Sequence, residues 1–344
     1  MVIAEKEVSN PAEIFEYLVS KHKDNTLVLA HADHDGQCSA LALKHIFKTE
    51  FQIEFSSDTL IGPEKLKQIN GKKLLIVSDV ILSSKHITSL IEEKDICIVD
   101  IDHHAVKHIN HDNYHCMNPK KLYNKDFISS AGLLSILYPE KSEEADQIIG
   151  AGTGADICIE DMTVLFSRIK EKYPGMLKGT SVRDVLNSRL FEAGNHLLLS
   201  SDTPEYSFKI LEKCLAYNSL DYLLCNPCLK AKKAQRDSEI DANFKKIKTI
   251  TTSDYTLMDS SNMFKYAGSY SVKANIDENS DKTYIEYHNG KLFFRNFFGK
   301  ENVKKIAQRF KGEHLCPNSR TGIAFTKMDF DEVSKEIAKH YLEK

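Results

Sequence analysis

The stretch Ile98-Val99-Asp100-Ile101-Asp102-His103-His104 decides the fold class of this chain. An apolar run rich in isoleucine and valine and bounded by polar residues is typical of a buried strand in a parallel sheet. Open α/β sheets bind their ligands just beyond the carboxyl ends of such strands. An acid and two histidines at that point therefore indicate a metal or phosphate site. The alternative is a polar loop with incidental histidines.

The sequence on both sides of this stretch alternates between strand-like and amphipathic helical segments, which is the pattern of βαβ units. The predicted strands are 26–30, 51–55, 73–79 and 95–102, and the predicted helices are 11–22, 38–47, 64–69, 84–92, 127–139 and 143–152. We therefore predict an α/β fold whose N-terminal domain is a doubly wound, mainly parallel sheet.

The pattern changes twice further along the chain. Residues 160–250 are mainly helical, and the charged stretch 231–248 predicts a long linking helix whose basic residues form a solvated face rather than a nucleic-acid groove. Strand-like runs then follow at 255–258, 266–272, 284–287 and 292–294, with helices at 303–310 and 330–342. We predict three parts: a domain of residues 1–185, a helical linker of residues 186–250 and a smaller α/β domain of residues 251–344.

Composition narrows the class of protein. The chain has 344 residues, of which 42% are hydrophobic and 28% charged, so it is long enough for two domains. A net charge of -3 leaves polyanion binding to local basic patches or bound metal. An apolar run of about 18 residues is missing, so we expect no membrane span. The acidic N-terminus is unlike a signal peptide, and we expect a cytoplasmic protein.

The eight cysteines are scattered, which is typical of reduced thiols. Only Cys225 and Cys228 have metal-like spacing. A second pair at zinc-ribbon distance is missing from the sequence, so we do not expect zinc there.

Four predicted strand or loop ends carry acids or histidines: His31-Ala32-Asp33-His34-Asp35-Gly36, Asp79, Asp102-His103-His104, and the glycine-rich turn from Gly150 to Asp156. Alternate residues of an extended segment point the same way, so His31, Asp33 and Asp35 converge. Each acid alone could be a helix N-cap, which is the more common role for Asp156. Together these carboxylates would repel one another without cations. Oxygen ligands with imidazoles favour Mn²⁺ or Mg²⁺ over zinc, and their number suits two ions about 3.5–4 Å apart.

In order and rough spacing, the four segments resemble the motifs of the DHH phosphoesterase family. The quoted matches are Asp33-His34-Asp35-Gly36, Asp79, Asp102-His103-His104 and Gly152-Thr153-Gly154-Ala155-Asp156. The C-terminal part resembles the family's substrate-binding domain through Arg295, the helix at 303–310 and the segments 312–314 and 318–322. Two positions depart from the pattern: Leu29 stands where many members have a histidine, and the segment 311–316 lacks the run of glycines.

The resemblance implies a role for each matching residue. One metal would be held by Asp33 and Asp79 with His31 as a further ligand, and the second by Asp35, Asp79, His103 and Asp156. His104 would face the substrate phosphate, and Asp102 would orient an imidazole. The implied substrate-binding residues of the second domain are Arg295, His314, Arg320 and Gly322. The active site would lie in the cleft between the domains.

We therefore predict a two-metal phosphodiester hydrolase that depends on Mn²⁺, with Mg²⁺ as the alternative ion. Its predicted activity is that of an exonuclease on single-stranded or short oligonucleotides. The alternatives are a phosphatase for 3′-phosphoadenosine 5′-phosphate or a phosphodiesterase for cyclic dinucleotides. An alternative of another class is a non-catalytic replication or repair scaffold. The sequence leaves a homodimer open.

Overall fold

The computed structural model describes residues 10–66, 69–104, 109–263, 267–278, 280–310, 312, 314–315, 318 and 320–343. The chain divides into two compact units, one ending at Leu229 and the other beginning at Lys230. This division falls within the residues expected to form a linker. Each unit contains a sheet of its own.

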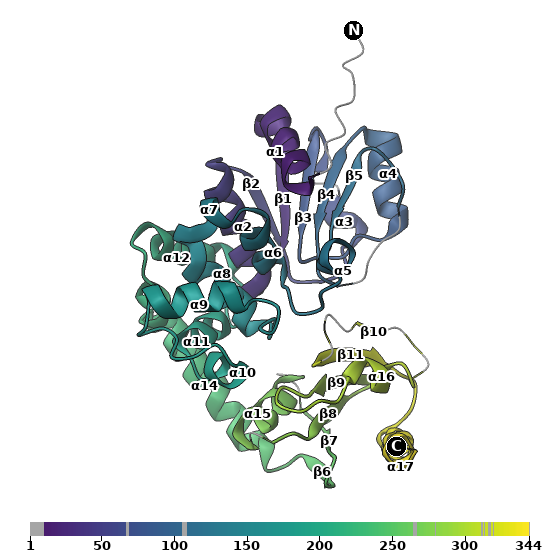
Figure 1. The fold of residues 1–344 in the computed structure, drawn as a ribbon. Helices are drawn as coiled ribbons and strands as arrows, with labels where there is room; N and C mark the ends of the chain where they lie inside the picture. The colour runs from purple at the N-terminus through teal and green to yellow at the C-terminus, as the bar shows by residue number, and fades with distance from the viewer. Residues whose placement is uncertain are drawn as a thin grey trace. The chain divides into compact units, whose positions relative to one another are not determined.

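The first unit is built on a parallel five-stranded sheet with the order β2-β1-β3-β4-β5 (Figure 1). The strands are β1 (Thr26–His31), β2 (Gln52–Ser56), β3 (Leu74–Ser78), β4 (Cys97–Ile101) and β5 (Tyr114–Met117). This architecture confirms the predicted α/β class. β5 was not predicted from the sequence, because this four-residue edge strand pairs with β4 alone among the strands of its sheet and therefore needs no long apolar run.

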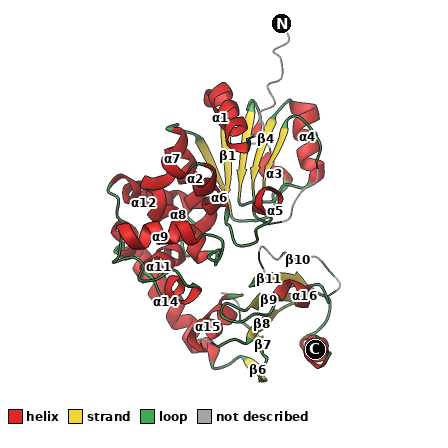
Figure 2. Cartoon of the chain, viewed as in Figure 1, coloured by secondary structure: helices red, strands yellow, loops and turns green. Residues whose placement is uncertain are grey.

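Helices cover both faces of this sheet (Figures 1 and 2). α1 (Pro11–His22) and α2 (His34–Phe47) share one face, where Phe15 packs against Phe47 at 4.9 Å between ring centroids. α3 (Pro63–Leu66) and α4 (Ser84–Lys94) cover the other face, where Ile87 of α4 packs against alternate residues of β1 and β3. Because both faces are covered, all five residues of β3 and of β4 are buried, which explains their continuous apolar character.

The first unit has further helices, most of which pack on α2 or on α8 (Asp146–Ala155). They are α5 (Pro119–Tyr123), α6 (Ser130–Leu137), α7 (Pro139–Ser142), α9 (Thr163–Lys172), α10 (Val182–Leu186), α11 (Arg189–Leu198), α12 (Pro204–Ala216) and α13 (Asp221–Leu224). A buried ion pair ties α9 to α8, because Arg168 donates to both carboxylate oxygens of the fully buried Asp146 at 2.6 and 2.9 Å. The helix α14 (Pro227–Phe244) crosses the division between the units.

The second unit has a six-stranded sheet with the order β10-β11-β9-β8-β7-β6. Its strands are β6 (Lys248–Thr251), β7 (Tyr255–Asp259), β8 (Thr283–His288), β9 (Lys291–Arg295), β10 (His314–Leu315) and β11 (Thr321–Phe325). β7 and β8 pair in parallel, and the other pairings are antiparallel. α16 (Val303–Ala307) and α17 (Phe330–Leu342) supply Val303, Ile306, Val333 and Ile337 to its core.

The strand expected at residues 266–272 is wrong for the residues that the structure describes. Ser269–Glu278 forms the helix α15, and residue 266 lies outside the described part. The buried carboxylate of Glu286 in β8 accepts the backbone N–H groups of Gly268 and Ser271 at 2.8 and 3.0 Å. This long-range partner satisfies N–H groups at the start of the helix, and the local sequence does not reveal it.

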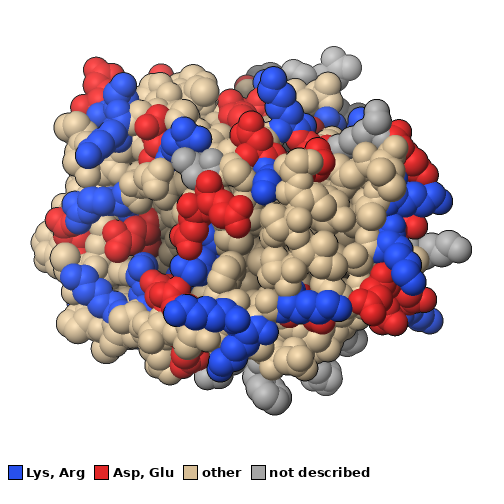
Figure 3. Space-filling view, turned by 90° about the horizontal axis from the view of Figure 1, so that it is seen from below, with Lys and Arg blue, Asp and Glu red and all other residues tan. Residues whose placement is uncertain are grey.

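No helix among the described residues combines the length and the apolar character needed to cross a membrane. On the face drawn in Figure 3, basic and acidic side chains are intermingled. This mixture agrees with the small net charge of the sequence.

Candidate metal centre

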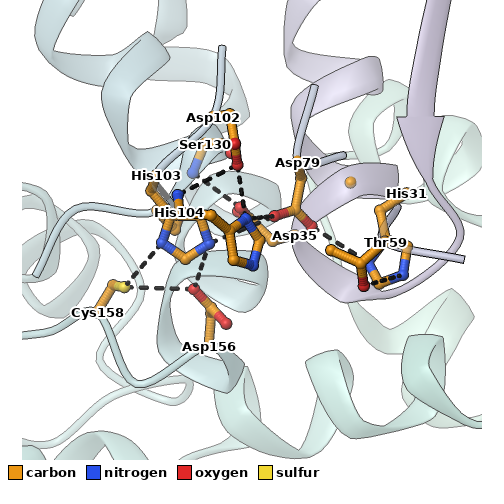
Figure 4. A network of polar contacts seen from close by, with 12 residues as sticks. His31, Asp35, Thr59, Asp79, Asp102, His103, His104, Ser130, Asp156 and Cys158 are labelled. Carbon is orange, nitrogen blue, oxygen red and sulfur yellow. Dashed lines mark hydrogen bonds and ion pairs between the residues drawn. The ribbon is translucent and has the colours of Figure 1, made fainter. Parts of the chain in front are cut away.

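The strand order places the candidate site where the chain reverses direction across the sheet. β1 is followed by a connection to β2 on one side, whereas β3 lies on its other side. Ligands of open α/β sheets bind at this switch point, beyond the carboxyl ends of the strands. The residues that follow β1, β3 and β4 meet there (Figure 4).

The end of β1 supplies His31 and Asp33. One oxygen of the Asp33 carboxylate accepts the N–H groups of Asp35 and Gly36 at 3.1 Å and caps α2. The other lies 2.8 Å from Nδ1 of His31. A methyl group at Gly36 would lie 2.2 Å from the carbonyl oxygen of His31, so only glycine allows this close turn. Asp33 is thus both a helix cap and a member of the site.

Asp79, directly after β3, lies at the centre of the cluster. Its φ angle is 58°, a left-handed conformation that is uncommon outside glycine, and its N–H donates to the carbonyl of Ile101 at 3.0 Å. One carboxylate oxygen is 3.5 Å from Nδ1 of His31, and the other is 3.3 Å from Nε2 of His103. Asp79 therefore reaches the histidines on both sides, as a bridging ligand would.

The end of β4 supplies Asp102, His103 and His104. The carboxylate of Asp102 lies 2.6 Å from Nδ1 of His104, so His104 is the imidazole that Asp102 orients. Asn118, after β5, donates to the Asp102 carbonyl at 2.6 Å and holds this turn. His103 turns the other way, and its Nε2 lies 3.3 Å from a carboxylate oxygen of Asp156 (Figure 4).

Asp156 enters the site from the end of a helix. The expected glycine-rich turn at 150–156 is wrong, because residues up to Ala155 belong to α8 and Asp156 is its C-cap. The glycines allow helices to pack closely: a methyl group at Gly152 would lie 2.8 Å from Cβ of Cys38 in α2. A carboxylate at the negative end of a helix dipole is unfavourable by itself, so Asp156 needs cationic neighbours.

Asp35 lies in the first turn of α2 and is buried. Its two carboxylate oxygens accept the N–H groups of Ser130 and Ala131 at 2.8 and 3.0 Å, at the start of α6. Burial and the negative charges of Asp79 and Asp156 raise the pKa of Asp35 to about 7. The α6 terminus fixes the position of this carboxylate, and each oxygen retains a second lone pair for a cation.

Two further residues at the site were not among the predicted ligands. His34 lies 3.9 Å from Asp156, and its ring nitrogens have no hydrogen-bond partner among the described residues. The extended segment expected through Asp35 ends at Asp33, because α2 begins at His34, so strand alternation applies neither to His34 nor to Asp35. The other is Cys158, whose thiol lies 3.3 Å from Asp156 and 3.9 Å from Nδ1 of His103. Its apolar neighbours in sequence made it look like a core residue.

The charges of the cluster are out of balance without cations. Burial lowers the pKa of His31, but the charges of Asp33 and Asp79 outweigh it and raise the pKa to about 11. Burial likewise opposes a charge on His34, yet Asp33 and Asp156 raise its pKa to about 9. Excess negative charge holds protons on the imidazoles, and a divalent cation could replace those protons.

Among the residues that the structure describes, three groups of donor atoms, each group with its atoms within 4.8 Å of one another, could hold a metal ion. They are His31 with Asp33 and Asp79, Asp79 with His103 and His104, and His103 with Asp156 and Cys158. The first two contain carboxylates and imidazoles and share Asp79. Such donors fit Mn²⁺ or Mg²⁺.

In the second unit, the pairing of β9 with β11 brings three of the four predicted substrate-binding residues together. Arg295 pairs with Thr321 and donates to the carbonyl of Gly322 at 3.5 Å. Nη1 of Arg320 donates to the carbonyls of Asn296, Phe297 and Gly299, so its guanidinium holds this loop. The backbone of His314 pairs in β10, and its side chain lies outside the described part.

Together the switch-point position and the shared carboxylate define an α/β unit with a candidate metal site. Residues 25–155 match the family described as the DHH family, N-terminal domain. The matched residues lie within the first unit and include all five strands of its parallel sheet. A comparison with curated protein sequences finds no match.

Solved structures agree with this fold. A DHH-domain structure, described as that of a member of a family of ribosomal proteins, has a TM-score of 0.68 and 15% identity, and the match covers 96% of this chain and 89% of that one. RecJ from Thermus thermophilus in complex with Mn²⁺ has a TM-score of 0.65 and 12% identity; the match covers 100% of this chain but 56% of that one. A manganese-bound exonuclease RecJ has a TM-score of 0.59 and 13% identity, and the match covers 97% of this chain and 95% of that one. At these identities the comparison shows a common fold.

Proposed function

We propose that this protein is a Mn²⁺-dependent phosphodiester hydrolase that removes nucleotides from the ends of single-stranded or short oligonucleotides. The observation that carries the proposal is the buried Asp79, whose carboxylate reaches His31 on one side and His103 on the other. The likeness to RecJ structures that contain Mn²⁺ supports the choice of ion. Mg²⁺ is the alternative ion.

In this proposal Asp79 is shared by two ions. Asp33 and His31 would complete the ligands of one ion, and Asp35, His103 and Asp156 would complete those of the other. When bound, the ions neutralise phosphate charge and make the proton of a water molecule easier to remove. The buried position of Asp79 and Asp35 fixes the carboxylates before substrate arrives, which favours electrostatic stabilisation of the transition state.

His104 is the residue that we place next to the scissile phosphate. Asp102 contacts its Nδ1 at 2.6 Å, so the ring is oriented and Nε2 remains for substrate. Burial lowers the pKa of His104, but the charge of Asp102 outweighs it and raises the pKa. A protonated imidazole can donate to a phosphate oxygen and pass its proton to the leaving oxygen. We assign Arg295, His314, Arg320 and Gly322 to the binding of a neighbouring phosphate or end group.

The test is hydrolysis with Mn²⁺ across a substrate panel. It contains end-labelled DNA and RNA of different lengths, 3′-phosphoadenosine 5′-phosphate, cyclic dinucleotides and bis-p-nitrophenyl phosphate. Preference for single strands or short oligonucleotides supports the proposal. Preference for 3′-phosphoadenosine 5′-phosphate or cyclic dinucleotides would replace it with a nucleotide phosphatase or phosphodiesterase.

The decisive variant is Asp79→Asn, because asparagine tolerates the left-handed backbone at this position. We expect hydrolysis to fall by about a hundredfold or more, since metal ions contribute several kcal/mol to such reactions. Asp112→Asn, at an exposed acid, is the control and should keep full activity. A wild-type protein without turnover on any substrate would favour a scaffold role, and full activity of Asp79→Asn would disprove the site.

A further inference from the structure

The thiol of Cys158 occupies an unusual place beside two candidate metal ligands. Cys158 is completely buried, and its sulfur lies 3.3 Å from Oδ2 of Asp156 and 3.9 Å from Nδ1 of His103 (Figure 4). Its neighbour His103 is also buried, whereas the side chain of Asp156 is 21% exposed. An ion can therefore approach this corner of the site from the side of Asp156.

The backbone between Asp156 and Cys158 is strained. Ile157 has a φ of 59°, which is a rare conformation for a β-branched residue. Such conformations are unfavourable and persist where the surrounding structure enforces them. Here the left-handed residue separates two side chains that both contact His103, so the turn presents an oxygen and a sulfur donor to one imidazole (Figure 4).

The spacing of these donors fits a tetrahedral zinc ion. Zinc bonds of about 2.3 Å to sulfur and 2.0 Å to nitrogen or oxygen, at tetrahedral angles, put the sulfur about 3.5 Å from either partner. The two measured separations, 3.3 and 3.9 Å, lie on either side of this value. Asp156 contacts His103 at Nε2, whereas the sulfur lies next to Nδ1, so a rotation of the imidazole or of the carboxylate is needed to bring all three donors to one ion.

We infer that Cys158, His103 and Asp156 form a binding site for a thiophilic divalent cation of the zinc type, distinct from the positions of the two Mn²⁺ ions. On binding, the S–H bond breaks, a sulfur–metal bond forms and the proton passes to solvent, without any change of oxidation state. The fourth ligand is a water molecule or another oxygen donor. A sulfur ligand selects zinc over manganese, and N/O/S sites bind zinc more tightly than manganese in any case.

Occupancy of this site excludes the proposed manganese pair. A neutral imidazole has one nitrogen lone pair, so His103 can serve a cation at Nδ1 or a cation at Nε2, but not both. Zinc at Nδ1 also takes the carboxylate of Asp156. This consequence rests on the proposed function, and it makes zinc an inhibitor of the Mn²⁺-dependent reaction.

The direct test uses Co²⁺ as a spectroscopic substitute for zinc in the full-length chain. Cys225 and Cys228 are exposed and the side chain of Cys316 is not described, so all three are first changed to serine. In this background, Co²⁺ should produce a sulfur-to-cobalt charge-transfer band in the near ultraviolet, and zinc should abolish it. Cys158→Ser should remove the band, whereas Cys97→Ser, at another buried cysteine, should keep it.

The zinc affinity of the Cys158→Ser variant gives the size of the expected effect. Loss of a partner that only orients a ligand weakens metal binding by about 10–100-fold, so loss of the sulfur ligand itself should weaken zinc binding by about 100-fold. Zinc should correspondingly inhibit the Mn²⁺-dependent reaction in the background protein at concentrations about 100-fold lower than in Cys158→Ser. If Cys158→Ser does not fold, zinc-edge X-ray absorption of the background protein tests the site instead. The bound zinc should then have a sulfur neighbour at about 2.3 Å.

The outcomes separate this inference from the proposed function. A Cys158-dependent cobalt band in a protein without hydrolytic activity would support the thiophilic site and reject the proposed function. Hydrolysis without a cobalt band, or with a band that survives Cys158→Ser, would overturn the thiophilic site and leave Cys158 as a residue that only positions His103 and Asp156.

Discussion

The metal-free protein should lose stability as the pH rises from 6.5 to 9. In the folded chain the pKa of His31 is raised from its ordinary value of 6.5 to about 11. The folded state therefore keeps a proton that the unfolded state releases, and the resulting stabilisation is complete below pH 6.5 and is lost as the pH approaches 11. At about 1.4 kcal/mol per pH unit, the loss by pH 9 is about 3 kcal/mol.

The titration of Asp35 also lowers the stability of the metal-free protein as the pH rises, but over a lower pH range. Its pKa is raised from 3.8 to about 7, so the folded state holds this proton over a range in which the unfolded state has lost it. Stability from Asp35 therefore falls between about pH 4 and pH 7. Burial is the larger cause for Asp35, and the negative charge of Asp79 contributes to both shifts.

The assay is urea unfolding in EDTA at pH 6.5, 7.5 and 9, repeated with saturating Mn²⁺. Bound ions should restore stability by about 2.7 kcal/mol at a hundred times their dissociation constant, with the largest gain at high pH. The variant His31→Gln should reduce the fall above pH 6.5 in the metal-free protein, and His34, whose pKa is raised to about 9, should account for part of the fall that remains. His111→Gln, at an exposed histidine, serves as the control.

Two outcomes would refute this reasoning. A free energy of unfolding that stays constant between pH 6.5 and 9 in EDTA would show that the His31 proton is not held by Asp33 and Asp79. An equal fall in wild type and in His31→Gln would assign the pH dependence to other groups.

Two substitutions test the packing that positions the site. Gly36→Ala would place a methyl group 2.2 Å from the His31 carbonyl and should destabilise the protein by about 3 kcal/mol, whereas Gly62→Ala meets no atom within 4 Å and should change stability by less than about 0.5 kcal/mol. Equal melting temperatures would contradict this difference. Arg168→Ala leaves the buried Asp146 without its cation and should cost about 3–5 kcal/mol in urea unfolding; a loss below about 1 kcal/mol would show that the pair is solvated.

The sequence predicted the strands correctly where a continuous apolar run marked them. The strands 73–79 and 95–102 are apolar on both faces because helices cover both sides of the sheet, so their pattern is unmistakable. The strand expected at 266–272 is wrong, since the buried Glu286 in β8 favours the start of a helix there. The edge strand β5 was missed because pairing with one neighbour requires no apolar run.

The candidate site was also predicted correctly in some respects and wrongly in others. Of the predicted metal ligands, the structure brings the ligand atoms of five into overlapping groups: His31, Asp33, Asp79, His103 and Asp156. Asp35, the sixth, belongs to none of these groups. The conformation of residues 150–156 was predicted as a turn but is helical, because its glycines permit close packing against α2.

By itself, the sequence determined that acids and histidines follow parallel strands, because strand ends and polar residues are local features that can be read along the chain. The tertiary structure alone decided which atoms meet. It placed Asp79 between His31 and His103, oriented His104 through Asp102, and set the thiol of Cys158 against His103. These contacts depend on strand order and on two left-handed residues, Asp79 and Ile157, whose conformations are enforced by packing rather than by local preference.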